Sequence, residues 1–167
     1  WGDKPYFPYR TGYSNRCIPW ARRAGFGSSY DAWKSRHSFH SWEERFMTTH
    51  PEWFALGKNG KRSNHIVFNA PGVKEQIIKD ASAWFDSGND YFSLINNDGY
   101  GQIDQTALTQ DNIDLKMGYF GFLSNVTHPT FFEVARELYK LYPDKKVVIG
   151  GYSNYCLPHT GAKQLSP

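Results

Sequence analysis

A carboxylate follows directly on a buried-looking apolar run near the middle of the chain. Residues 91–95, Tyr-Phe-Ser-Leu-Ile, are aromatic and branched, and they break into the polar sequence Asn96-Asn97-Asp98-Gly99. Such a run predicts a buried strand that ends where the polar loop begins. In α/β proteins, ligands and catalytic groups gather at the carboxyl ends of parallel strands. Asp98 therefore stands where a catalytic carboxylate would be expected.

The same loop also has a plain structural interpretation. Asn and Asp side chains bond their own backbone and Gly accepts a positive φ, so Asn-Asn-Asp-Gly is also ordinary turn chemistry. In the functional interpretation, Asp98 would be an acid, and the neighbouring Asn97 and Tyr100 would contact the ligand. Both interpretations stay open at this point.

Two short elements near the amino end offer further ligand contacts. Two prolines keep residues 5–13 out of a helix and predict a short extended segment that contains Arg10 near its end. The guanidinium of Arg10 is an ordinary surface cation if exposed, but in a buried strand it needs a partner such as a sugar hydroxyl or a carboxylate. Residues 18–27 form a second short element, which includes Trp20 and ends in a Gly-Ser turn.

Polar and aromatic residues alternate over residues 36–42, which predicts a third strand. His37 would lie on one face of this strand, and His40 and Trp42 on the other. The spacing of the two histidines matches neither a strand face nor a helical two-histidine metal clamp. We therefore predict no metal site here. His37 and His40 are expected to form hydrogen bonds in a polar cleft, and Trp42 is a candidate ligand contact.

The elements that must position these residues follow an α/β order. Apolar residues recur at helical spacing over 71–86, and a second helix is predicted from Pro129, with Phe131, Ala135, Leu138 and Tyr142 on one face. The polar stretch between 102 and 125 would lie beside Asp98 as a lid or cleft wall. Residues 146–155 predict another buried strand that again runs into a polar aromatic loop, and Tyr152 in this stretch is a further candidate ligand contact. This alternation predicts a parallel sheet with helical crossovers.

Composition narrows the function classes. The 167 residues are 40% hydrophobic, enough for one domain with a core, and aromatics reach 17%. These rings either fill the core or provide stacking platforms for sugar rings. A net charge of +3, carried by scattered cations, argues against a nucleic-acid partner, and no apolar run reaches the length of a membrane span. Cys17 and Cys156 allow one bridge, and the redox compartment stays open.

Several motifs together resemble a known family over roughly residues 5 to 155. They are His50-Pro51-Glu52-Trp53-Phe54-Ala55-Leu56 with Gly60-Lys61-Arg62, a helix opened by Asn69 and Pro71, the Asn97-Asp98-Gly99 turn, and Tyr142-Pro143-Asp144-Lys145 before a strand ending in Tyr152. In these motifs the chain resembles the domain-of-unknown-function 4838 family, which is related to α-glucuronidases and hexosaminidases built on (β/α)8 barrels.

The resemblance implies an α/β fold of the (β/α)8 TIM-barrel type and a secreted, extracellular or periplasmic carbohydrate-active protein without a cofactor. In α-glucuronidases an Asn-Ser-Glu-Gly loop after the fourth strand carries the general acid, and Asp98 takes the place of that Glu. Arg10 matches an arginine that holds substrate at the end of the first strand in related barrels. A Cys-rich segment that often follows the turn in this family is absent, and Gly101-Gln102-Ile103-Asp104 stands there instead.

Length sets a further expectation, because a (β/α)8 barrel typically needs about 250 residues. The predicted strands reach only about the fifth of the eight strands of a barrel. Residues 1–167 are therefore expected to form part of a single barrel domain. A longer chain or a partner subunit would then close the barrel. Glycoside hydrolysis normally uses two carboxylates, and the second is expected beyond residue 167.

The leading hypothesis is a glycoside hydrolase that acts on a polysaccharide or oligosaccharide, with uronic-acid-containing sugars among the expected substrates. The alternative is a non-catalytic glycan-binding or structural module on the same barrel. A complete small doubly wound domain is a third interpretation, but no glycine-rich phosphate fingerprint follows any predicted strand.

Overall fold

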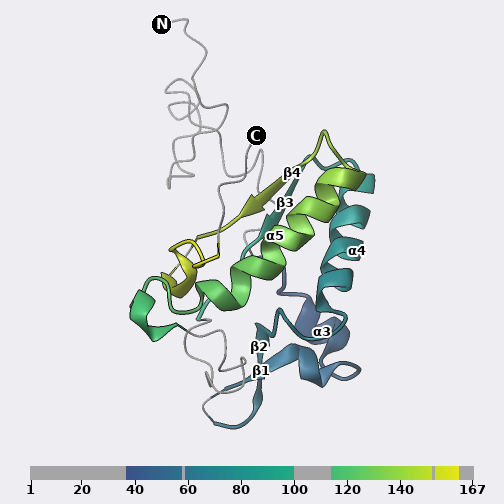
Figure 1. Ribbon diagram of the computed structural model, residues 1–167. Coiled ribbons are helices and arrows are strands. Elements are labelled where there is room, and N and C mark those ends of the chain that lie inside the picture. Colours follow the sequence, from purple (N-terminus) through teal and green to yellow (C-terminus); the bar gives the residue numbers. More distant parts are fainter. Residues whose placement is uncertain (1–36, 58, 100–113, 152, 162–167) are drawn as a thin grey trace, which may run out of the picture. The chain divides into compact units, whose positions relative to one another are not determined.

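The structure, a computed structural model, describes residues 37–57, 59–99, 114–151 and 153–161. The predicted elements over 5–13 and 18–27 lie outside these ranges, as do four candidate residues: Arg10, Trp20, Tyr100 and Tyr152. In chain order (Figure 1), the described elements are α3 (Trp42–Phe46), the 3-10 helix η2 (Pro51–Trp53), β1 (Phe54–Leu56), β2 (Arg62–Ile66), α4 (Val73–Asp86), β3 (Tyr91–Leu94), the 3-10 helix η6 (Leu115–Met117), α5 (Ser124–Leu141), β4 (Lys146–Ile149) and the 3-10 helix η7 (Ser153–Tyr155).

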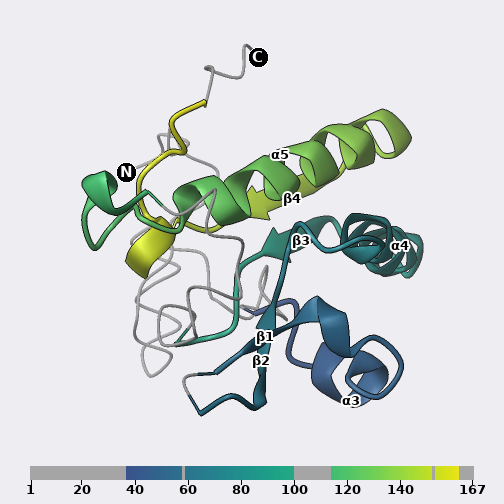
Figure 2. The same ribbon diagram turned by 60° about the horizontal axis from the view of Figure 1, so that its bottom comes forward.

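The predicted parallel pairing is confirmed for β3 and β4. Their register runs from Tyr91 opposite Lys146 to Leu94 opposite Ile149. Parallel neighbours need a long crossover connection, and α5 lies within it. Helix α4 packs beside β3, α5 packs beside β4, and the two helices contact each other (Figure 2). The carboxyl ends of both strands therefore meet at one edge of this sheet.

The pair β1 and β2 forms an antiparallel hairpin that the sequence pattern did not predict. Across its turn, the Gly57 N–H donates to the Lys61 carbonyl at 2.7 Å. The strands are too short to display a clear alternation. Within the described residues the strands thus form two sheets of two strands each. The (β/α)8 barrel stays a prediction.

The strand predicted over residues 36–42 is wrong where the structure describes it. Residues 37–41 form turns, and α3 begins at Trp42. Phe39 and Trp42 are both 1% exposed, and the Trp42 N–H donates to the Phe39 carbonyl at 3.1 Å. Two buried rings three residues apart require a turn or helix, because a strand would send them to opposite faces.

The predicted helix over 71–86 is confirmed as α4, and its buried residues are core, as expected. Helix α5, in contrast, begins five residues before the predicted start at Pro129. A proline this close to the amino end costs few helical hydrogen bonds. The preceding turn buries Val126, Thr127 and His128, which favours helix in that stretch.

Gly150 provides a test of how closely the edge of this sheet is packed. A Cβ atom on Gly150 would lie 2.6 Å from Cγ1 of Ile95. We expect Gly150→Ala to lower the free energy of unfolding by about 1–3 kcal/mol in chemical denaturation, since a β-branched neighbour yields little. Gly161→Ala is the control, because its nearest atoms are 3.4 Å away. Ile95→Ala in the Gly150→Ala background should relieve the clash, and no relief would contradict this explanation.

Candidate functional site at the carboxyl edge of β3 and β4

The loop that follows β3 exposes the side chain of Asp98 to solvent. Asn96 and Asn97 are buried, whereas the Asp98 side chain is 72% exposed. Gly99 has a φ of 80°, in the left-handed region that favours glycine. The loop therefore buries two amides and presents one carboxyl at the edge where β3 and β4 end.

The Asn97 side chain ties this loop to the hairpin. Its Nδ2 donates to the backbone carbonyl of Asn64 in β2 at 2.7 Å. Among the described residues, no hydrogen-bond partner reaches Oδ1 of Asn97 or either side-chain amide atom of Asn96. Such buried amide atoms cost free energy until a polar group satisfies them.

His37 lies against the same loop and pairs with the carboxyl. Its Nδ1 lies 2.6 Å from the Asn96 carbonyl, and because a carbonyl only accepts, Nδ1 must carry the proton. Nε2 lies 3.6 Å from Oδ2 of Asp98. In the neutral ring Nε2 holds a lone pair, so a proton shared with Asp98 comes either from an imidazolium or from a protonated carboxyl. At 3.6 Å the two groups form an ion pair only when the ring is protonated.

His65 on β2 was missed by the sequence analysis, because β2 itself was not predicted. Its side chain is buried, and burial lowers its pKa. The negative charge of Asp98 opposes that shift and raises the pKa. The carboxyl thus acts electrostatically on His65.

The structure brings together three of the predicted site residues, His37, Asn97 and Asp98, and it places two others apart from the loop's polar contacts. His40 is exposed and stacks on His37, with ring centroids 5.0 Å apart. Trp42 lies in the core, where its indole N–H donates to Asp80 at 2.9 Å.

An exposed apolar group, which we call the aromatic platform, lies at the end of β4. It consists of Leu115, Tyr119, Phe120 and Leu157, whose exposed fractions are 73%, 63%, 60% and 42%. The rings of Tyr119 and Phe120 meet edge to face at 5.2 Å. Most of these residues come from the stretch 102–125 that was predicted to form a cleft wall.

Two contacts attach the aromatic platform to the segment that follows β4. The Leu157 N–H donates to the Phe120 carbonyl at 2.9 Å, and the Tyr119 hydroxyl lies 3.2 Å from Oγ of Ser153. Because β3 and β4 are parallel, this segment leaves the sheet at the same edge as the Asp98 loop. The Asp98 carboxyl and the exposed rings therefore lie beyond the same edge of the sheet.

Other ligand classes find little support in the described part of the chain. No three His, Cys, Asp or Glu side chains gather there as a metal site would require. None of the helices in these ranges has the length and apolarity needed to cross a membrane. Cys156 is exposed, and Cys17 lies outside the described residues, so their pairing stays untested.

Comparisons with known proteins add no constraint, since no family model, no curated protein and no solved structure matches the chain. The resemblance to the domain-of-unknown-function 4838 family stays a prediction.

The electrostatic link between Asp98 and His65 can be measured directly. We expect Asp98→Asn to lower the pKa of His65 further, because the carboxylate is what raises it against burial. NMR titration of the His65 ring protons would report the shift. Asp144→Asn is the control, since Asp144 lies at the other end of the strands. An unchanged His65 titration in Asp98→Asn would contradict the link.

Proposed function

We propose that this chain is part of a glycoside hydrolase in which Asp98 is the general acid. The observation that carries the proposal is the exposed Asp98 carboxyl paired with His37 at the carboxyl edge of two parallel strands. Active sites of α/β barrels lie at this edge. The proposal includes a (β/α)8-type barrel completed by further chain or by a partner subunit, and a secreted protein.

In this mechanism the Asp98 carboxyl would give a proton to the glycosidic oxygen as its bond to the anomeric carbon breaks. A water molecule, or first a second carboxylate, then bonds the anomeric carbon, and the proton lost by water returns to a carboxylate. The second carboxylate would come from outside the described residues. His37 would hold the Asp98 carboxyl in place while the proton leaves.

The aromatic platform supports a sugar as the substrate. Pyranose rings carry apolar C–H faces and polar hydroxyls, which match exposed rings beside the Tyr119 and Ser153 hydroxyls. Uronic-acid-containing saccharides remain the proposed class, with Arg10 as the proposed partner of the sugar carboxylate. Trp20, Tyr100 and Tyr152 remain proposed ligand contacts, as does His40.

A non-catalytic glycan-binding module is the second candidate. The aromatic platform favours it equally, because stacking of a sugar on Tyr119 and Phe120 needs no acid. In that case Asp98 would only accept a hydrogen bond from a sugar hydroxyl. Calorimetry separates the two candidates, since a module binds oligosaccharide without turning it over.

The acid is tested by Asp98→Asn in the natural full-length protein. We expect kcat on aryl glycosides and uronides to fall by roughly 10²-fold or more, the usual contribution of general acid catalysis. Asp144→Asn is the matched control, because Asp144 is also an exposed carboxylate. Asp144 precedes β4, whereas Asp98 follows β3. Because the two strands are parallel, Asp144 lies at the opposite end of the sheet.

Two results would contradict the enzyme proposal. Unchanged hydrolysis in Asp98→Asn would exclude Asp98 as the acid. Oligosaccharide binding by the wild-type protein without hydrolysis of any glycoside in the panel would favour the binding module.

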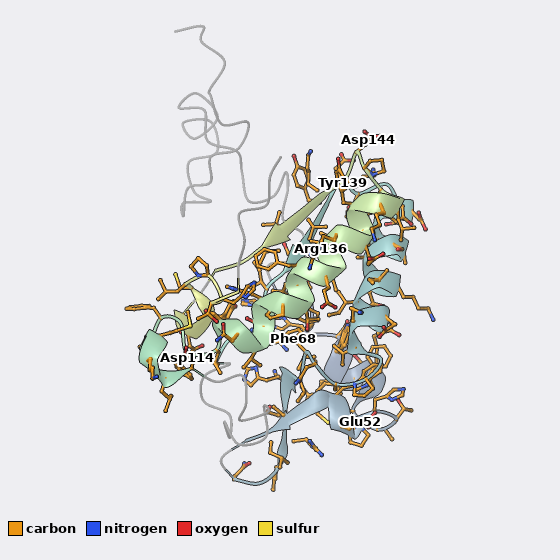
Figure 3. All side chains as sticks on the ribbon, in the orientation of Figure 1. Glu52, Phe68, Asp114, Arg136, Tyr139 and Asp144 are labelled. Atoms are coloured by element: carbon orange, nitrogen blue, oxygen red, sulfur yellow. The ribbon has the colours of Figure 1, made fainter. Side chains whose placement is uncertain are left out.

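The aromatic platform is tested separately by Tyr119→Ala. Loss of one stacking ring is worth about 1 kcal/mol, so we expect Kd for an oligosaccharide to rise roughly fivefold in calorimetry. Tyr139→Ala is the control, because Tyr139 is 67% exposed but lies near the carboxyl end of α5 (Figure 3). Equal effects of the two substitutions, or none from Tyr119→Ala, would exclude this platform as the sugar contact.

A further inference from the structure

His128 is a buried titratable residue that the proposed chemistry does not use. It lies in the first turns of α5 and is 5% exposed. Its ring meets three others, Tyr155, Phe132 and His159, with centroids 6.2, 5.9 and 6.3 Å away. No described residue forms a hydrogen bond with either of its ring nitrogens. The ring is thus packed as a neutral, largely aromatic side chain.

Residues 153–161, which we call the covering segment, lie across the start of α5. Asn154 accepts a hydrogen bond at its carbonyl from the Leu123 N–H at 2.9 Å. The Ser124 hydroxyl donates to the Leu157 carbonyl at 2.5 Å, and the Thr160 N–H donates to Oδ1 of Asn125 at 2.9 Å. The covering segment also supplies the Tyr155 and His159 rings that contact His128. It is therefore held by these hydrogen bonds, by the Leu157 and Ser153 contacts to Phe120 and Tyr119, and by the packing around one imidazole.

The groups that face His128 do not compensate a positive charge. Burial lowers its pKa most, and repulsion from His159 lowers it further. The Tyr155 backbone opposes this shift and raises the pKa of His128. Burial also lowers the pKa of His159. Neither His159 nor Tyr155, the described residues that change the pKa of His128, carries a carboxylate. Mild acid would therefore place two cations, His128 and His159, against each other.

We propose that His128 is an acid-sensitive latch: the neutral ring holds the covering segment on α5, and its protonation, together with that of His159, releases the segment. Because the folded form favours neutral His128, the contribution of this ring to stability is complete above about pH 6.5, the ordinary pKa of histidine, and is lost as pH falls below it. Release would alter the aromatic platform, since the covering segment carries Leu157 and Ser153. The latch does not depend on the proposed hydrolase activity.

Hydrogen exchange on the natural full-length protein tests the latch. At pH 5.0 we expect the amides of Leu123, Leu157 and Thr160 to lose protection relative to pH 7.5 by roughly tenfold or more, after correction for intrinsic exchange. His128→Phe keeps an apolar ring and should abolish this acid dependence. His50→Gln is the control, because His50 is more exposed and stacks on Trp53 with centroids 4.0 Å apart. This control should retain the acid response.

Equal protection of these amides at both pH values in the wild-type protein would overturn the latch, as would an unchanged acid response in His128→Phe. If His128→Phe does not fold, His159→Gln provides a second variant. Without His159, a protonated His128 is repelled less, so the amides should lose protection only at a lower pH. An unchanged pH would contradict the role of His159 in the latch. NMR titration of the wild-type His128 ring is independent of any variant, and a midpoint at or above the ordinary histidine value would also overturn the proposal.

Discussion

The burial of Phe39 is the interaction on which the candidate site depends. Its ring packs against Trp42, Phe68 and Phe131, with centroids 5.3 to 6.4 Å apart, and so joins three segments distant in sequence. Aromatic rings bury a large apolar area, which makes such a cluster a strong anchor. His37 lies two residues earlier, and the hydroxyl of Ser38 between them donates to the carbonyl of Ser93 in β3. The cluster therefore holds His37 beside the end of β3, where Asp98 lies.

The parallel pairing of β3 and β4 supplies the second constraint. Parallel strands send their carboxyl ends to one edge, so the Asp98 loop and the covering segment leave the sheet together. The close approach of Gly150 to Ile95 keeps the two exits in contact. The Asp98 carboxyl and the aromatic platform then lie beyond the same edge. The proposed hydrolase uses both of them, whereas the proposed binding module needs only the platform.

Three histidines show how surroundings assign different roles to one residue type. His37 has the Asn96 carbonyl on one nitrogen and the Asp98 carboxyl 3.6 Å from the other, so hydrogen bonding fixes its place. His65 is buried but remains within reach of the Asp98 charge. His128 is buried against a second imidazole, so acid opposes its packing. For His65 and His128, burial and the nearest charge decide the direction of the pKa shift, because they set the free energy of the charged form.

The sequence by itself determined the elements whose patterns are long or strongly apolar. Helical spacing predicted α4, and apolar runs predicted β3 and β4 with Asp98 directly after β3. It misplaced residues 36–42, because polar and aromatic residues alternate there, whereas Phe39 and Trp42 are buried together by a turn. Only the tertiary structure brought His37 to the carbonyl of Asn96, 59 residues away, and Asn97 to Asn64, 33 residues away. Local periodicity reports which face of an element is buried, but such long-range partners are chosen by how the buried faces pack.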